Sequence, residues 1–172
     1  DWQQDLSFSY ERVGDILLRQ IDLDGALKAF QNSLDIREKL AIRDESDTEW
    51  QWDLSISQNK LGNILQRQGN LDLALRVYMA NADIIKNLTV RDESNTLWQW
   101  SLSASYDKLG NIQQHQDDLD GAFASFLNSF YIREKLVALD ESNTQWQRGL
   151  STSYDKLGNI LQRQGNLDLA LR

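Results

Sequence analysis

Few side chains in this sequence have the types and spacing that catalysis or metal binding requires. His115 is the only histidine, and the chain has no cysteine, so zinc sites built from His and Cys ligands are excluded. Arg67 and Arg163 stand 48 residues to either side of His115. That pattern indicates a polar surface position and not a general base.

The serine and aspartate residues do not form a recognisable catalytic or calcium-binding motif either. A Leu-Ser-x-Ser motif recurs along the chain, for example at Ser55 and Ser57, but no histidine accompanies it to activate a nucleophile. The acidic string Asp117–Gly121 begins like a calcium loop, yet no glutamate follows at the spacing that such a loop requires. Acids at the start of a helix explain it better. We predict a non-enzymatic chain without a cofactor or a metal.

Composition excludes several further classes. The 172 residues are 41% hydrophobic and 26% charged, as in ordinary globular proteins. A net charge of −8 argues against nucleic acid as a partner. No apolar run reaches the roughly 18 residues of a membrane span, and the start, DWQQDLSFSY, does not resemble a signal peptide. We expect a cytoplasmic chain that belongs to a longer, multidomain protein, because it begins and ends inside a repeat.

One segment of the sequence recurs at a fixed spacing along the whole chain. KLGNILQRQGNLDLALR at Lys60–Arg76 returns letter for letter at Lys156–Arg172, and diverged copies occupy Arg12–Leu27 and Lys108–Phe123. The period is 48 residues, and a fixed period of roughly 20–50 residues is typical of stacked repeat units. We therefore divide the single predicted array into residues 1–48, 49–96, 97–144 and an incomplete 145–172.

Each full unit carries two helical patterns of about 20 residues. In the second unit, apolar residues recur at steps of three and four, first from Trp50 to Leu65 and then from Leu71 to Leu88. The chain has no proline that would interrupt them. Thr48 and Gln51 have the spacing of a capping box at the first helix. Between the helices, Gly69-Asn70 predicts a left-handed turn and an N-cap. Units one and three lack this glycine, so we expect a slightly different turn there.

Tryptophan also follows the period. A tryptophan begins each first helix, and we predict that these residues lie in the core at the junction with the preceding helix: Trp2, Trp50, Trp98 and Trp146. Trp52 and Trp100 are different, because Gln4 and Arg148 replace them in the other units. They are either a partly exposed contact patch or a local packing feature.

These features resemble the tetratricopeptide repeat. The order Leu61-Gly62, Gly69, Ala74 and Tyr78 is similar to that family's pattern of small residues and one aromatic. The period of 48 residues and the ending LDIREKL at Leu34–Leu40 resemble the longer, kinesin-light-chain-like variety. Arrays similar to the WQxDLS…KLGN form occur in bacterial signalling proteins. The resemblance implies an all-α, right-handed superhelix of antiparallel helix pairs, about three and a half repeats long.

The resemblance also implies a concave groove that the first helices line. In the family, an asparagine just after the packing glycine bonds the backbone of an extended peptide, since an amide offers both a donor and an acceptor. The matching positions here are Asp15, Asn63, Asn111 and Asn159. One turn earlier stand Glu11, Asn59, Asp107 and Asp155, and one turn later Arg19, Arg67, His115 and Arg163. The family's carboxylate clamp is not supported, because its lysine would fall on the acidic row.

Two functions remain open at this point. The first is an interaction scaffold that binds a peptide or a partner segment in this groove. The second is a structural array that self-associates, because the apolar side of Leu167–Leu171, the start of a second helix, has no partner in the sequence. The same residues also allow a plain alternative to the groove, in which the asparagines and their neighbours satisfy one another on a solvated face.

Overall fold

The computed structural model describes residues 1–165, and their regular structure consists of α-helices. The first helix of each repeat alternates with a second helix, and the helices are 18 to 21 residues long. In order they are α1 (Trp2–Arg19), α2 (Leu23–Arg43), α3 (Thr48–Arg67), α4 (Leu71–Arg91), α5 (Thr96–His115), α6 (Leu119–Leu139) and α7 (Thr144–Arg163). The predicted all-α repeat fold and its helix lengths are confirmed.

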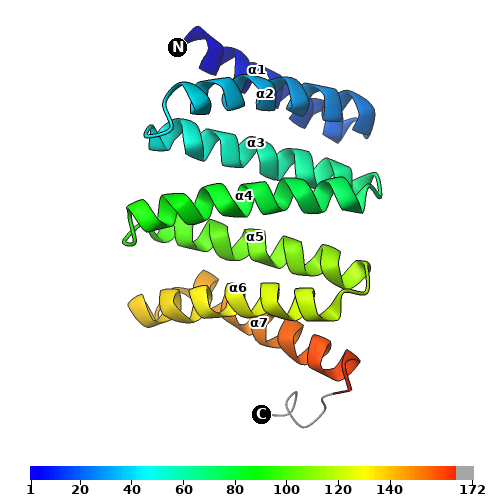
Figure 1. The fold of residues 1–172 in the computed structure, drawn as a ribbon, viewed down its shortest axis with the longest axis vertical. Helices are drawn as coiled ribbons and strands as arrows, with labels where there is room; N and C mark the ends of the chain where they lie inside the picture. Colours follow the sequence, from blue (N-terminus) through cyan, green and yellow to red (C-terminus); the bar gives the residue numbers. More distant parts are fainter. Residues whose placement is uncertain (166–172) are drawn as a thin grey trace. The chain divides into compact units, whose positions relative to one another are not determined.

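The chain divides into two compact units, residues 1–88 and 89–172. The boundary falls in the last turn of α4. Within each unit, successive helices run in opposite directions and pack side by side (Figure 1). A single array of about three and a half repeats and its right-handed twist stay predictions.

Packing within a repeat depends on one glycine and one aromatic ring. A Cβ placed on Gly62 of α3 would lie 2.6 Å from a ring carbon of Tyr78 in α4, closer than carbon atoms approach. Gly14 meets Phe30 and Gly110 meets Phe126 in the same way. Only glycine permits this approach, so the two helices of each pair touch through a backbone and a ring face.

The same aromatic residue joins one repeat to the next. In unit one, Ala26, Phe30 and Ile64 form a buried cluster that connects α2 with α3. In unit two, Ala122, Phe126 and Ile160 form its equivalent. Helices α3 and α7 are therefore each fixed by the aromatic residue of the second helix before them.

The predicted capping box is wrong in detail. Helix α3 begins at Thr48, and its N-cap is Asp47, whose carboxylate accepts from the backbone N–H groups of Glu49 and Trp50. Asn95 and Asn143 cap α5 and α7 in the same way. Aspartate and asparagine are stronger N-caps than threonine. Gln51 donates instead to the carbonyl oxygen of Ala41, at 3.2 Å, and so ties the helix start to α2.

The turn between paired helices is the same in all the described repeats. Gly69 and Gly165 have φ of 77° and 78°, as the sequence predicts for a left-handed position. Ile21 and Asp117 adopt φ of 64° and 63° at the equivalent sites. The expectation of a different turn without glycine is therefore wrong, because the helix packing imposes the same backbone path on residues that disfavour it.

The tryptophan prediction holds only in part. Trp2 is 70% exposed, since no described helix precedes α1. Trp50, Trp98 and Trp146 are half-buried. Arg43 from the end of α2 lies over the Trp50 ring at 4.5 Å. The indoles that begin the later first helices thus cover the edge of the core and do not enter it.

Hydropathy along the helices is modest throughout. None of the helices in residues 1–165 combines the length and apolar character that crossing a membrane requires.

Candidate functional site

A pocket of ≈ 400 Å³ lies between α1 and α3 in unit one. Asp15, Asn63 and Arg67 line it, so the structure brings together two members of the asparagine row and one member of the basic row of the predicted groove. Phe30 and Lys60 complete part of its wall. The wall therefore combines an aromatic ring with charges of both signs.

The acidic side chains of α1 are already paired within the protein. Lys60 Nζ lies 2.8 Å from Asp15 Oδ2 and 3.7 Å from Glu11 Oε1. One lysine of α3 thus neutralises part of the charge of two carboxylates of α1. A partner segment would have to compete with Lys60 for Asp15.

Asn63 is also bonded within the protein. Its Nδ2 donates to Asn59 Oδ1 at 3.2 Å, and the Tyr78 hydroxyl donates to Asn63 Oδ1 at 2.7 Å. Phe30 and Phe126 occupy the position of Tyr78 in the repeats on either side, so the hydroxyl bond is particular to the second repeat. In that repeat the contacts favour the plain alternative, in which the amides satisfy one another.

The two amides of unit two are differently placed. Asn111 on α5 is half-buried and Asn159 on α7 is exposed. Neither side chain has a hydrogen-bond partner among the described residues. Asp155, one turn before Asn159, is exposed as well. These amides offer a donor and an acceptor each without a competing contact.

The basic row lies on the surface. All four members are exposed: Arg19, Arg67, His115 and Arg163. Arg163 Nη2 lies 2.9 Å from Asp117 Oδ1, in an exposed pair of the kind that contributes little to stability. The row can therefore rearrange toward a ligand at low cost.

Asp107, by contrast, is part of the interior. Its Oδ2 lies 2.7 Å from Arg133 Nη2 and 3.1 Å from Lys156 Nζ. The Asp107 side chain is 13% exposed and that of Arg133 6%. Removing one member of such a buried pair strands the other charge, so these contacts indicate a structural role for Asp107.

Arg37 forms an equivalent network in unit one. It is 1% exposed and holds both oxygens of Glu11, with Nη2 at 3.1 Å from Oε2. Its remaining bonds go to the Ser7 and Ser57 hydroxyls and to the Asp53 carbonyl oxygen. Partners on two helices, α1 and α3, thus satisfy the buried guanidinium, which fastens both helices to α2.

The network of Arg133 repeats this arrangement 96 residues later. Arg133 on α6 donates to the Ser103 and Ser153 hydroxyls and to the Gly149 carbonyl oxygen. The recurring serines therefore serve as hydrogen-bond acceptors for buried arginine. The second repeat has Ile85 at this position, so the polar junction occurs once in each compact unit.

The sequence analysis did not predict these arginine networks. Arg37 lies within the apolar stripe of its helix, between Leu34 and Leu40. A charged residue on such a stripe, with an acid at a fixed repeat position, is the signal that would have found it. Nothing local identifies which acid is the partner, because Glu11 and Arg37 are on different helices.

Trp52 and Trp100 are both half-buried. The Arg133 guanidinium lies 5.2 Å from the centre of the Trp100 ring. A Cβ on Gly149 would lie 2.5 Å from that ring, so the indole packs directly on the backbone of α7. For Trp100, local packing and partial exposure occur together.

Burial shifts the pKa values of Lys108 and Tyr78 strongly. Burial lowers the pKa of Lys108 on α5 to about 8, and it raises the pKa of Tyr78 well above 10. In residues 1–165, no three His, Asp or Glu side chains converge as metal ligands.

No family profile matches the sequence, and no curated protein matches it. The fold is similar to several solved structures. Apo RapI shares 13% identity with a TM-score of 0.74, covering 97% of this chain and 52% of RapI. BtubC (BKLC) from P. vanneervenii shares 19% identity with a TM-score of 0.76, covering 96% of this chain and 59% of BtubC. This chain thus spans between half and three fifths of those proteins.

A third structure is similar over nearly its whole length. It contains the nearly identical TPR-like repeats of a putative kinesin light chain from Podosopora anserina, with 15% identity, a TM-score of 0.55, and coverage of 98% of this chain and 91% of that one. The chain therefore has the TPR-like fold, an all-α repeat fold of stacked antiparallel helix pairs.

Proposed function

We propose that the chain is a non-enzymatic interaction scaffold whose first helices bind an extended segment of a partner protein. TPR-like helical repeats generally mediate protein interactions. The observation that carries the proposal is the pair of amides of Asn111 and Asn159, which lack partners among the described residues. Each occupies the position after the packing glycine on a first helix.

The pocket between α1 and α3 supports the same surface in unit one. It contains Asn63 and Arg67 at the equivalent positions. Asn63 is less suited to a ligand, because Tyr78 and Asn59 already bond its amide. We therefore assign the main peptide contacts to unit two, with His115 and Arg163 as adjustable neighbours.

The test starts with peptides selected from a displayed random library against the whole chain. Calorimetry then compares their affinity for the wild type and for Asn111→Ala/Asn159→Ala. Loss of two or more amide hydrogen bonds should weaken binding about tenfold. The helical circular dichroism and the melting temperature should stay nearly unchanged, since neither amide holds the fold together.

Asn128→Ala is the matched control, because Asn128 is an exposed asparagine on the second helix α6 of the same unit. It should leave the affinity unchanged. Adding Asn63→Ala to the double variant should reduce stability as well as binding, because it removes the nearer of two described acceptors of the Tyr78 hydroxyl. Full binding by the double variant, or failure to select any peptide, would reject the proposal.

Self-association is the second candidate function, and α1 provides an observation in its favour. Val13 and Ile16 are 47% and 53% exposed. The equivalent residues of α3, Leu61 and Ile64, are 6% and 0% exposed, in the core that α3 forms with α2. The face of α1 is thus built to receive a second helix. Leu167–Leu171, on which the sequence-based form of this hypothesis depends, lie outside the described residues.

Light scattering over a range of concentrations tests this candidate. If α1 associates with another copy, the apparent mass should rise with concentration, and Val13→Gln/Ile16→Gln should abolish the rise. Asn128→Ala again serves as the unchanged control. A constant monomer mass in the wild type would eliminate self-association through this face.

A further inference from the structure

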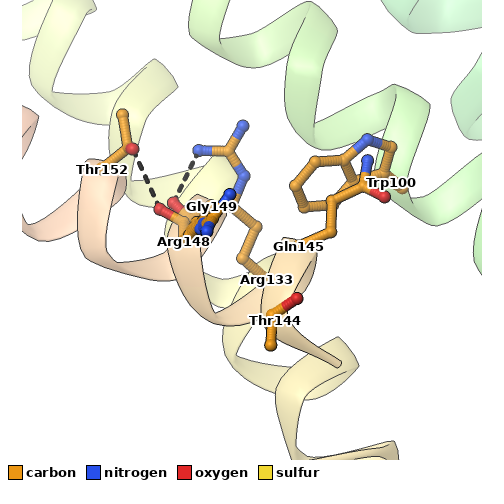
Figure 2. Close-up of a pocket in the computed structure, with 7 residues that line it drawn as sticks. All are labelled: Trp100, Arg133, Thr144, Gln145, Arg148, Gly149 and Thr152. Atoms are coloured by element: carbon orange, nitrogen blue, oxygen red, sulfur yellow. Dashed lines mark hydrogen bonds between the residues drawn. The ribbon is translucent and has the colours of Figure 1, made fainter. Parts of the chain in front are cut away.

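A second pocket, of ≈ 540 Å³, lies at the start of α7 in unit two (Figure 2). Figure 2 shows the Trp100 indole of α5 and the Arg133 guanidinium of α6 beside the Gly149 backbone of α7. No acidic residue is among those that line it: Trp100, Arg133, Thr144, Gln145, Arg148, Gly149 and Thr152. This is unusual in a chain with a net charge of −8.

The equivalent place in unit one is acidic and internally bonded. Gln4 Nε2 donates to Glu49 Oε1 at 3.1 Å and to Asp53 Oδ2 at 3.2 Å. Burial raises the pKa of Asp53, while the charge of Arg37 and the bond from Gln4 counteract that rise. Unit one thus supplies its own carboxylates next to its buried arginine.

Unit two has lost those carboxylates while it keeps the arginine. Gln145 stands in place of Glu49, and Gly149 in place of Asp53. Arg148 replaces Trp52 and adds a cation. The remaining acid of the junction, Asp107, is shared between Arg133 and Lys156. The same architecture therefore has an excess of negative charge in unit one and of positive charge in unit two.

The pocket also retains donors that no described residue uses. Arg148 is exposed, and its guanidinium has no partner among the described residues. Arg133 has five N–H donors, and the bonds described above use one at Nε, two at Nη1 and one at Nη2. The Trp100 ring shields the guanidinium from water on one side. Charge-assisted bonds to carboxylates are strongest in such partly desolvated surroundings.

We propose that this pocket binds the side-chain carboxylate of a glutamate or aspartate in a partner segment. Arg148 and Gln145 bond the carboxylate, and Trp100 packs against the aliphatic part of the incoming side chain. The partner's acid takes the place that Glu49 and Asp53 occupy in unit one. The proposal rests on the proposed function for the ligand being protein, and it adds an acidic residue as a requirement on that protein.

The probe is the capped tripeptide acetyl-Gly-Glu-Gly-amide, with acetyl-Gly-Gln-Gly-amide as its neutral match. Both are titrated into the whole chain while ¹⁵N–¹H spectra follow the Trp100 indole and the amides of residues 145–149. The glutamate peptide should give saturable shifts at these positions, and the glutamine peptide should give none. Equal responses to the two peptides, or shifts only elsewhere, would overturn the proposal.

Variants identify the residues responsible. Arg148→Gln should weaken the affinity about fivefold or more, because it removes the accessible cation. Gln145→Glu, which restores the acid of unit one, should have at least the same effect. The control is Glu49→Gln, which exchanges a carboxylate for an amide at the equivalent position of unit one. It should leave the titration unchanged. Unaltered binding by both Arg148→Gln and Gln145→Glu would reject the site.

Two further arms separate the sources of the signal. Acetyl-Gly-Gln-Gly with a free terminal carboxylate tests recognition of a chain end, and a response to it without one to the glutamate peptide would reject the side-chain assignment. Asn111→Ala/Asn159→Ala should keep the tripeptide response while losing selected peptides. If the double variant loses binding of the selected peptides and keeps the tripeptide response, both proposals are supported. If the wild-type chain responds to the tripeptide but selects no peptide from the library, only the proposed function is rejected.

Discussion

Ile21 has a strained backbone conformation. It is a β-branched residue in the left-handed region, with φ of 64°, and its side chain is 83% exposed. That backbone conformation costs an L-residue about 1–2 kcal/mol. Ile21→Gly should therefore raise the free energy of unfolding by about 0.5–1 kcal/mol, after the extra chain entropy of glycine is subtracted. Urea denaturation measures this.

Gly69→Ile is the reverse change at the equivalent turn, where φ is 77°. It should lower the free energy of unfolding by about 1–2 kcal/mol. A destabilised Ile21→Gly would show that contacts of the isoleucine outweigh the backbone strain.

Arg37 and Glu11 form a buried ion pair, and we expect their contributions to the free energy of unfolding to be coupled. Arg37→Ile should cost about 3 kcal/mol, because Glu11 is left buried with only Lys60 nearby. The double change Arg37→Ile/Glu11→Asn reproduces Ile85 and Asn59 of the second repeat. It should regain more than half of the loss in the free energy of unfolding. Additive losses in this double-mutant cycle would contradict the coupling.

At the scale of the helices, two glycines at the same repeat position allow the cost of a side-chain contact to be separated from the gain in helix propensity. Gly62→Ala places a methyl group against the fully buried Tyr78 ring and should cost about 1–3 kcal/mol. Gly158 occupies the same repeat position in α7, but no described atom lies within 4 Å of its Cβ position. Gly158→Ala should be neutral or stabilising by up to about 1 kcal/mol. Thermal melts distinguish the two, and an equal loss in both would refute the contact.

The helices themselves were predictable because their signals are local. Apolar periodicity and Gly69 are read within a few residues of where they act. The choice of Asp47 over Thr48 as N-cap was not predicted, since both residue types can cap. The structure has the stronger capping residue at this position in each described case, Asp47, Asn95 and Asn143.

At the scale of the whole molecule, two buried groups set the alkaline stability. Lys108 has a pKa of about 8 when folded and 10.5 unfolded. Between these values the unfolded chain binds more protons, so the free energy of unfolding rises with pH. The pKa of Tyr78 is raised above its ordinary 10.0, so above pH 10 the folded chain binds more protons and stability falls. We expect maximal stability near pH 10.

Two variants assign these slopes. Lys108→Met should flatten the rise between about pH 8 and 10, and Tyr78→Phe should remove the fall above it. Phenylalanine already fills the equivalent positions at Phe30 and Phe126, so the second variant should fold normally. Denaturation curves measured at each pH check both, and a wild-type stability that falls steadily from pH 8 would contradict the assignment.

The candidate site was predictable only as a set of repeat positions. Asp15, Asn63, Asn111 and Asn159 were found because they share one place in the period. Their different surroundings come from residues on other helices. Tyr78 bonds Asn63, whereas Phe126 leaves Asn111 without that bond.

The sequence by itself determined the period, the helix pairs and the glycine-to-aromatic joint, because each depends on spacing along one or two neighbouring helices. Tertiary structure alone decided which charges are buried. Glu11 and Arg37 lie 26 residues apart in the chain, as do Asp107 and Arg133. Whether such a pair lies inside or in a groove depends on where three helices meet. That meeting also makes the surroundings of the buried arginine acidic in unit one and basic in unit two, through side chains from separate helices.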